Sequence, residues 1–199
     1  LDFSSGCLQM DPRPCENVAE LWAWEAPGHH STHNPDIEEL RPGPTPLRHP
    51  QLLVCHDVRG DSAGYSRWEG SAVSDCPPFL FTHWWHIDIF CYFGHKMVTI
   101  PPPSITSLAH RHGVKVIGTL AFEQGTGRTS LSRILSTEQN MQRTIDKLVH
   151  IMQKWRFEGW VVDVELSIPK HEVSMLVNFL RKLTAATKEA NPQATVLWY

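Results

Sequence analysis

A chain of 199 residues is long enough to form one domain with a substantial hydrophobic core. Hydrophobic residues make up 41% of the chain and charged residues 20%, which is typical of a soluble globular protein. The net charge is only -3 with neutral histidines, and no apolar run approaches the ~20 residues of a membrane span. We therefore predict no nucleic-acid partner and no membrane insertion.

The cysteines and histidines do not form a recognisable ligand or disulfide pattern. The cysteines are odd in number, irregularly spaced and lack a Cys-x-x-Cys pair: Cys7, Cys15, Cys55, Cys76 and Cys91. This favours free thiols in a reducing compartment. The chain has 12 histidines, but none stands at a metal-ligand spacing. We predict no metal site and no cofactor.

Residues 1–50 are rich in Pro, Gly and His and have no steady hydrophobic period. Pro42, Pro44 and Pro46 interrupt any helix. Trp22 and Trp24 suggest one short extended piece that packs on the rest of the protein. We predict that residues 1–50 form a lead-in segment to a domain that covers residues 51–199.

From residue 52 onward, predicted strands and helices alternate. The β-branched and aromatic runs predict strands at 52–57, 87–93, 114–120, 157–165 and 194–199. Residues 58–79 are predicted to be a long loop, and helices are predicted at 104–112 and at 169–190. Between them, Ser136 and Gln139 form a capping-box pattern that starts another helix. The apolar face of that helix would consist of Met141, Ile145, Leu148, Met152 and Trp155.

This alternation predicts an α/β fold with parallel strands joined by right-handed helical crossovers. A doubly wound sheet and an eight-stranded barrel both fit the pattern. No glycine-rich phosphate loop follows any strand, which weakens a nucleotide-binding version of the doubly wound fold.

Four acids follow predicted strands, at Asp57, Glu123, Asp163 and Glu165. The last two stand two residues apart, so a strand would place both on one face, about 7 Å apart along the backbone. In a barrel all four would lie at the carboxyl-end rim, where active sites occur. Acids with aromatics nearby suit a glycoside hydrolase. The alternative is that Asp163 and Glu165 are two solvated acids just past a strand end.

Several blocks resemble the endo-β-N-acetylglucosaminidases of glycoside hydrolase family 85. The blocks are LVCHD at 53–57, HWWHIDIF at 83–90, HKMVTIPP at 95–102, AHRHGVKV at 109–116 and FEGW at 157–160. The resemblance covers residues 51–199 and implies a (β/α)8 TIM barrel of which this chain holds the first five strands. We expect residues 1–199 alone to be inactive, because three strands of such a barrel would be missing.

The resemblance also implies an activity and its residues. The family cleaves the GlcNAc-β-1,4-GlcNAc bond of the N-glycan core with retention, and the substrate's own acetamide serves as the nucleophile. Glu165 would be the acid/base and Asp163 would orient the acetamide. We expect further substrate contacts from Glu123, Asp57, Trp160 and Trp198. The implied substrates are N-glycans of glycoproteins or free oligosaccharides, and the implied protein is a cytosolic monomer.

The chain departs from the family pattern at three places. Asp163 stands where the family usually has Asn, Gln124 replaces the Trp of a Thr-Glu-Trp run, and residues 104–107 replace a Gly-Trp-Thr-Asn run. Two aromatics suited to stacking on sugars are therefore missing. A catalytically silent relative that binds glycans or partners is the alternative function.

Overall fold

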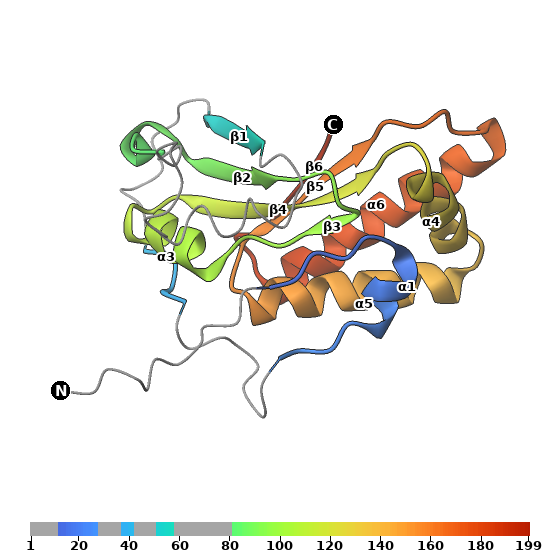
Figure 1. Ribbon diagram of the computed structural model, residues 1–199, viewed down its shortest axis with the longest axis horizontal. Coiled ribbons are helices and arrows are strands. Elements are labelled where there is room, and N and C mark those ends of the chain that lie inside the picture. The colour runs from blue at the N-terminus through green and yellow to red at the C-terminus, as the bar shows by residue number, and fades with distance from the viewer. Residues whose placement is uncertain (1–11, 28–36, 42–50, 58–80) are drawn as a thin grey trace, which may run out of the picture.

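The computed structural model describes residues 12–27, 37–41, 51–57 and 81–199 and is built around one six-stranded sheet (Figure 1). Five parallel strands follow the order β1-β2-β4-β5-β6. The strands are β1 Leu53–Asp57, β2 Ile89–Phe93, β3 Val98–Thr99, β4 Lys115–Phe122, β5 Gly159–Val164 and β6 Thr195–Trp198. The short β3 runs antiparallel to β4. The five predicted strands are confirmed, whereas the predicted loop 58–79 lies outside the described residues.

The helices from residue 103 onward follow the predicted pattern with two differences. They are α1 Val18–Ala23, the 3-10 turn η1 Trp84–His86, α3 Pro103–Arg111, α4 Thr126–Leu135, α5 Glu138–Lys154 and α6 Lys170–Ala190. Helix α4 was not predicted, because Gly125 and Gly127 at its start indicate a loop. Helix α5 is capped by Thr137, whose side chain accepts from the N–H of Asn140, and not by the predicted Ser136. Across the described ranges, no helix is long and apolar enough to cross a membrane.

The strand order decides between the two predicted architectures. Parallel strands are neighbours in the order in which the chain reaches them, and the helices lie together on one face of the sheet (Figure 1). A doubly wound sheet reverses its strand order at a switch point and carries helices on both faces. The observed arrangement is the wall of a (β/α) barrel, so the predicted TIM-barrel type is confirmed for this part of the barrel.

Alternate residues of each strand face two different hydrophobic clusters. The larger cluster lies between sheet and helices and includes Phe90, Val116 and Val162. The smaller one lies on the other face and is made by residues of odd number alone: Leu53, Ile89, Cys91, Phe93, Ile117, Val161 and Leu197. We call this second face the inner face, because it corresponds to the interior of the barrel.

The described part of residues 1–50 packs into the same core. Trp22 lies in α1 and not in the predicted extended piece, because Asn17 caps the helix by accepting from two backbone N–H groups. The indole of Trp22 donates to Thr144 at 2.9 Å, and Arg133 and Arg143 lie over its ring. Residues 12–27 are therefore part of the barrel's outer layer.

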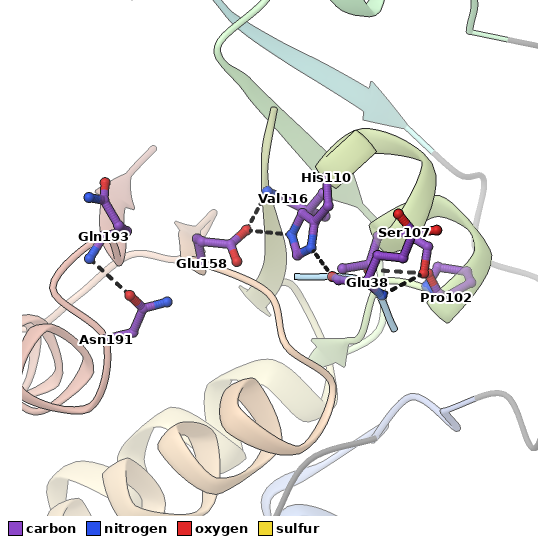
Figure 2. Close-up of polar contacts among 9 residues, drawn as sticks. Glu38, Pro102, Ser107, His110, Val116, Glu158, Asn191 and Gln193 are labelled. Carbon is purple, nitrogen blue, oxygen red and sulfur yellow. Dashed lines mark hydrogen bonds and ion pairs between the residues drawn. The ribbon is translucent and has the colours of Figure 1, made fainter. Parts of the chain in front are cut away.

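A buried ion pair joins three elements at the amino end of β5. Figure 2 shows His110 of α3 between Glu158 and the Glu38 carbonyl, with Nε2 3.0 Å from the Glu158 carboxylate and Nδ1 2.6 Å from the carbonyl. The same Glu158 oxygen accepts from the N–H of Val116 at 2.9 Å. Burial alone would lower the pKa of His110, but the hydrogen bond and charge of Glu158 raise it above its ordinary value.

Gly159 opens β5 in a conformation that other residues rarely adopt. Its φ is +128°, and a Cβ placed there would lie 1.9 Å from the carbonyl oxygen of Thr195 on β6. The close approach of the two backbones at this point fixes the start of the β5–β6 pairing.

We expect Gly159→Ala to cost more than about 4 kcal/mol, because it adds a backbone clash to an unfavourable φ. Gly125→Ala is the matched control: its φ is +82°, but nothing lies within 4 Å of the added Cβ. Conformational strain alone should cost it about 1–3 kcal/mol. Urea unfolding of both variants measures the difference, and equal losses would contradict the clash.

We expect Glu158→Ala to cost about 3–5 kcal/mol, because it leaves buried His110 without its counter-charge. Glu39→Ala, which removes an 85% exposed partner of Arg156, should cost less than about 1 kcal/mol. The pKa of His110 is raised in the folded state, so its contribution is complete below its ordinary pKa of 6.5 and is lost as pH rises through the raised value. Urea unfolding at several pH values should show this decline in the parent and not in Glu158→Ala.

Candidate active site

The alternation of side chains along β5 places Asp163 and Glu165 on the inner face. Trp160 and Val162 pack in the helix-side cluster, so Val161, Asp163 and Glu165 point the other way. Asp163 is only 1% exposed, whereas Glu165 lies just past the strand and is exposed. The N–H of Glu165 donates to the Phe122 carbonyl at 3.1 Å, which ties this end of β5 to β4.

The other two predicted acids lie at the same end of the sheet. Asp57 is the last residue of β1, and Glu123 follows β4 directly. Both continue the odd-numbered series of the inner face. The parallel register pairs Ala121 of β4 with Asp163 of β5, so Glu123 and Glu165, each two residues further on, end neighbouring strands. The structure thus gathers all four acids at the carboxyl ends of the strands.

His95 is a site residue that the sequence reasoning did not identify. Its Nδ1 lies 2.7 Å from a Glu123 oxygen and its Nε2 lies 3.2 Å from an Asp57 oxygen. The hydrogen bond with Glu123 raises the pKa of His95, burial opposes this rise, and the charges of Glu123 and Asp57 add to it. The signal was available, because His95 continues the odd-numbered series Ile89, Cys91 and Phe93 past the end of β2.

The Asp163 carboxyl group is buried without full hydrogen bonding. Within the described part of the chain, its Oδ1 has no hydrogen-bond partner. Burial raises the pKa of Asp163, the negative charges of Glu165 and Glu123 raise it further, and His95 lowers it. The alternative of two solvated acids does not hold for Asp163. A buried acid without partners and with a perturbed pKa is typical of a functional site.

The two tryptophans do not lie with the acids. Trp160 is 0% exposed on the helix side of β5, where its ring packs edge-on against Phe157 with centroids 4.9 Å apart. Gly118 on β4 makes room for it, since a Cβ there would lie 3.0 Å from the indole. The expected sugar contact by Trp160 is therefore corrected to a core role.

Trp198 is paired in register with Val162, whose side chain also faces the helices, so strand alternation turns Trp198 away from the inner face. It is 58% exposed. Its position gives no support to a contact with substrate bound at the acids.

The residue types at the site are those of acid–base chemistry. Both ring nitrogens of His95 are occupied by carboxylates that lie on opposite sides of the ring, which is not an arrangement around one metal ion. Among the residues the structure describes, no group of three or more His, Cys, Asp and Glu side chains could hold a metal. Cys15, Cys55 and Cys91 are free thiols; Cys7 and Cys76 lie outside the described residues.

Two solved structures, a glycoside hydrolase domain and a chitinase, share this fold. The glycoside hydrolase domain of Endo-D from Streptococcus pneumoniae R6 superposes with a TM-score of 0.63 at 17% identity, over 96% of this chain and 32% of that one. A chitinase from Bacteroides thetaiotaomicron superposes with a TM-score of 0.50 at 13% identity, over 74% of this chain and 46% of that one. At these identities the comparison establishes the fold alone.

Curated relatives are closer in sequence. A cytosolic endo-beta-N-acetylglucosaminidase of Gallus gallus is 38% identical over 99% of this chain and 27% of its own length. Those of Homo sapiens and Mus musculus are 38% and 40% identical over 92% of this chain and 25% of their own lengths. The chain thus spans about a quarter of the length of these relatives.

The sequence model for glycosyl hydrolase family 85 matches residues 65–199, which is more than half of the chain. It includes β2 to β6 and therefore Glu123, Asp163 and Glu165. The resemblance identified from the sequence blocks is confirmed: the chain belongs to glycosyl hydrolase family 85.

Proposed function

We propose that the protein carrying this chain is an endo-β-N-acetylglucosaminidase that cleaves between the two N-acetylglucosamines of the N-glycan core. The observation that carries the proposal is the pair on β5, with buried Asp163 and exposed Glu165 two residues apart on the inner face. Membership of family 85 and the names of the relatives support the reaction class.

The two carboxyl groups differ in the way that substrate-assisted hydrolysis requires. Glu165 is exposed at the rim, so it can donate a proton to the glycosidic oxygen as the bond to the leaving sugar breaks. The acetamide oxygen of the substrate attacks the anomeric carbon and forms an oxazolinium ion. Glu165, now a carboxylate, then takes a proton from the water that opens this ion, and the original configuration is restored. No enzyme nucleophile is needed, unlike the usual two-carboxylate scheme.

Asp163 acts on the acetamide in this proposal. As a carboxylate it accepts a hydrogen bond from the acetamide N–H, which holds the carbonyl oxygen toward the anomeric carbon and stabilises the positive charge of the oxazolinium. Its unpartnered Oδ1 is available for such a bond within the described structure. The raised pKa of Asp163 sets a lower pH limit, because protonation leaves only the weaker acceptor oxygen of a neutral carboxylic acid.

Asp57 and Glu123, both at the same rim, are proposed as hydrogen-bond partners for sugar hydroxyls. The proposed substrates are N-glycans on glycoproteins or free oligosaccharides, and the proposed compartment is the cytosol, which the names of the relatives support. That the protein works as a monomer stays a prediction.

We expect Glu165→Gln to lower turnover by at least ~100-fold, because the amide can neither donate nor accept the proton. The assay incubates the full-length gene product with a fluorescent high-mannose Asn-glycopeptide and follows release of the peptide that bears one N-acetylglucosamine. Glu189→Gln, on the exposed surface of the last turns of α6, is the matched control and should behave like the parent.

Full activity of Glu165→Gln would rule out the assigned acid/base. A folded parent that binds the glycopeptide without cleaving it would instead establish the silent glycan-binding relative.

We expect Asp163→Asn to retain turnover and to lose the decline at low pH that Asp163 causes in the parent. The asparagine keeps an acceptor oxygen that does not titrate, whereas Asp163→Ala removes the acceptor and should lower turnover by roughly 100-fold. The measurement is kcat against pH for all three proteins. An identical acidic limb in parent and Asp163→Asn would contradict this role of Asp163.

The same substitution has a predicted effect on stability. The folded-state pKa of Asp163 is raised, so the folded protein loses stability as pH rises from the ordinary value of 3.8 through the raised value. Asp163→Asn should therefore have a higher Tm than the parent at pH 7, and the gain should disappear near pH 3. A lower Tm for Asp163→Asn than for the parent at pH 7 would show that the Asp163 carboxylate does not destabilise the folded protein.

A further inference from the structure

His95 links the ends of three neighbouring strands. It follows β2, which lies between β1 and β4 in the sheet, and its ring reaches the acid at the end of each neighbour. The contacts are 2.7 Å to Glu123 and 3.2 Å to Asp57, one from each ring nitrogen. Both nitrogens can donate at once only in the protonated ring, so this geometry is that of an imidazolium.

Two other basic side chains, Lys96 and Arg128, form ion pairs with acids outside the site. Lys96, the next residue, forms an ion pair with Glu16 at 2.6 Å. Arg128 in the first turn of α4 pairs with Glu172 of α6 at 2.9 Å. His95 is the group whose charge opposes those of Glu123 and Glu165 at Asp163.

The groups around His95 come from three other strand ends of the site. His95 contacts Asp57 after β1 and Glu123 after β4. The register pairs Ala121 of β4 with Asp163, so Asp163 and Glu165 lie one strand further along the rim. Deeper on the inner face, Cys55 and Cys91 are thiols and carry no positive charge. Two carboxyl groups thus contact His95, and two more end the next strand of the sheet.

We infer that His95 is a positioning residue of the proposed reaction: it holds Glu123 and Asp57 in place across the strand ends, and its positive charge, one strand away from Asp163, favours the ionised form of that carboxyl group. This inference rests on the proposed function and extends it to a residue that touches the reacting atoms only through its neighbours. A purely structural bridge would tie the strands together without any effect on the protonation of Asp163.

The test compares His95→Gln and His95→Lys with the parent, in the full-length gene product. Glutamine removes the charge, so the acidic limb of kcat against pH should move to higher pH. Lysine keeps the charge, so the limb should return toward that of the parent. In an Asp163→Asn background, which lacks the acidic limb caused by Asp163, the glutamine substitution should not change the pH dependence of kcat. His86→Gln, at the exposed end of η1 before β2, is the matched control.

A second measurement does not depend on activity or on a variant that folds. Carbon NMR of the Asp163 carboxyl group in the parent should show a second inflection at the pH where the His95 ring titrates. If the parent has no turnover, the proposed function fails. The inflection still shows whether the charge of His95 affects the ionisation of Asp163.

An unshifted limb in folded His95→Gln, or a single inflection for Asp163, would overturn the inference and leave His95 as a bridge between strands. A shifted limb that lysine does not restore would likewise assign the effect to geometry instead of charge.

Discussion

The register and facing of β5 are the constraint on which the rest of the site depends. At its start, Glu158 is held by His110 and by the N–H of Val116, and Gly159 permits the contact with β6. At its end, Glu165 donates its N–H to Phe122 of β4. Because Trp160 and Val162 are buried against the helices, the alternation of side chains along β5 directs Asp163 to the inner face. A slip of one residue would exchange the two faces: Val162 or Val164 would take the place of Asp163, and the indole of Trp160 would turn to the inner face.

Gathering four carboxyl groups at one rim is electrostatically unfavourable, and the structure shows how the cost is distributed. Asp57 and Glu123 share His95, and Glu165 remains in contact with solvent. The largest electrostatic cost of ionisation falls on Asp163, because it is buried, has an unpaired oxygen and lies near other negative charges. The raised pKa of Asp163 is thus a consequence of the arrangement of its neighbours, and it is the property that links the fold to the pH range of the proposed reaction.

Much of this fold follows from local sequence, and the exceptions have physical reasons. The five strands and the facing of Asp163 and Glu165 were predictable, because β-branched runs and a period of two are local properties. Helix α4 was missed because two glycines close together usually indicate a loop. Here Gly125 and Gly127 lie at the start of the helix, where glycine is tolerated. Trp160 was misassigned because an indole ring can pack in a core or stack on a sugar. The two roles are distinguished by strand alternation, which places Trp160 on the same face as Val162, toward the helices. His95 was missed because its partners are 28 and 38 residues away in sequence.

The acids at the two ends of β5 differ in what they contribute to the protein. These acids are Glu158 at the amino end and Asp163 and Glu165 at the carboxyl end. Glu158 is buried at the amino end and fully engaged with His110 and a backbone N–H, so it serves the fold. Asp163 is equally buried but lacks such partners, so its burial is a net cost that a structural role alone would not maintain. Glu165 is exposed and free to exchange protons with solvent. In a (β/α) barrel the amino end of the strands maintains the fold and the carboxyl end carries the active site, and the hydrogen-bonding state of these acids follows the same division.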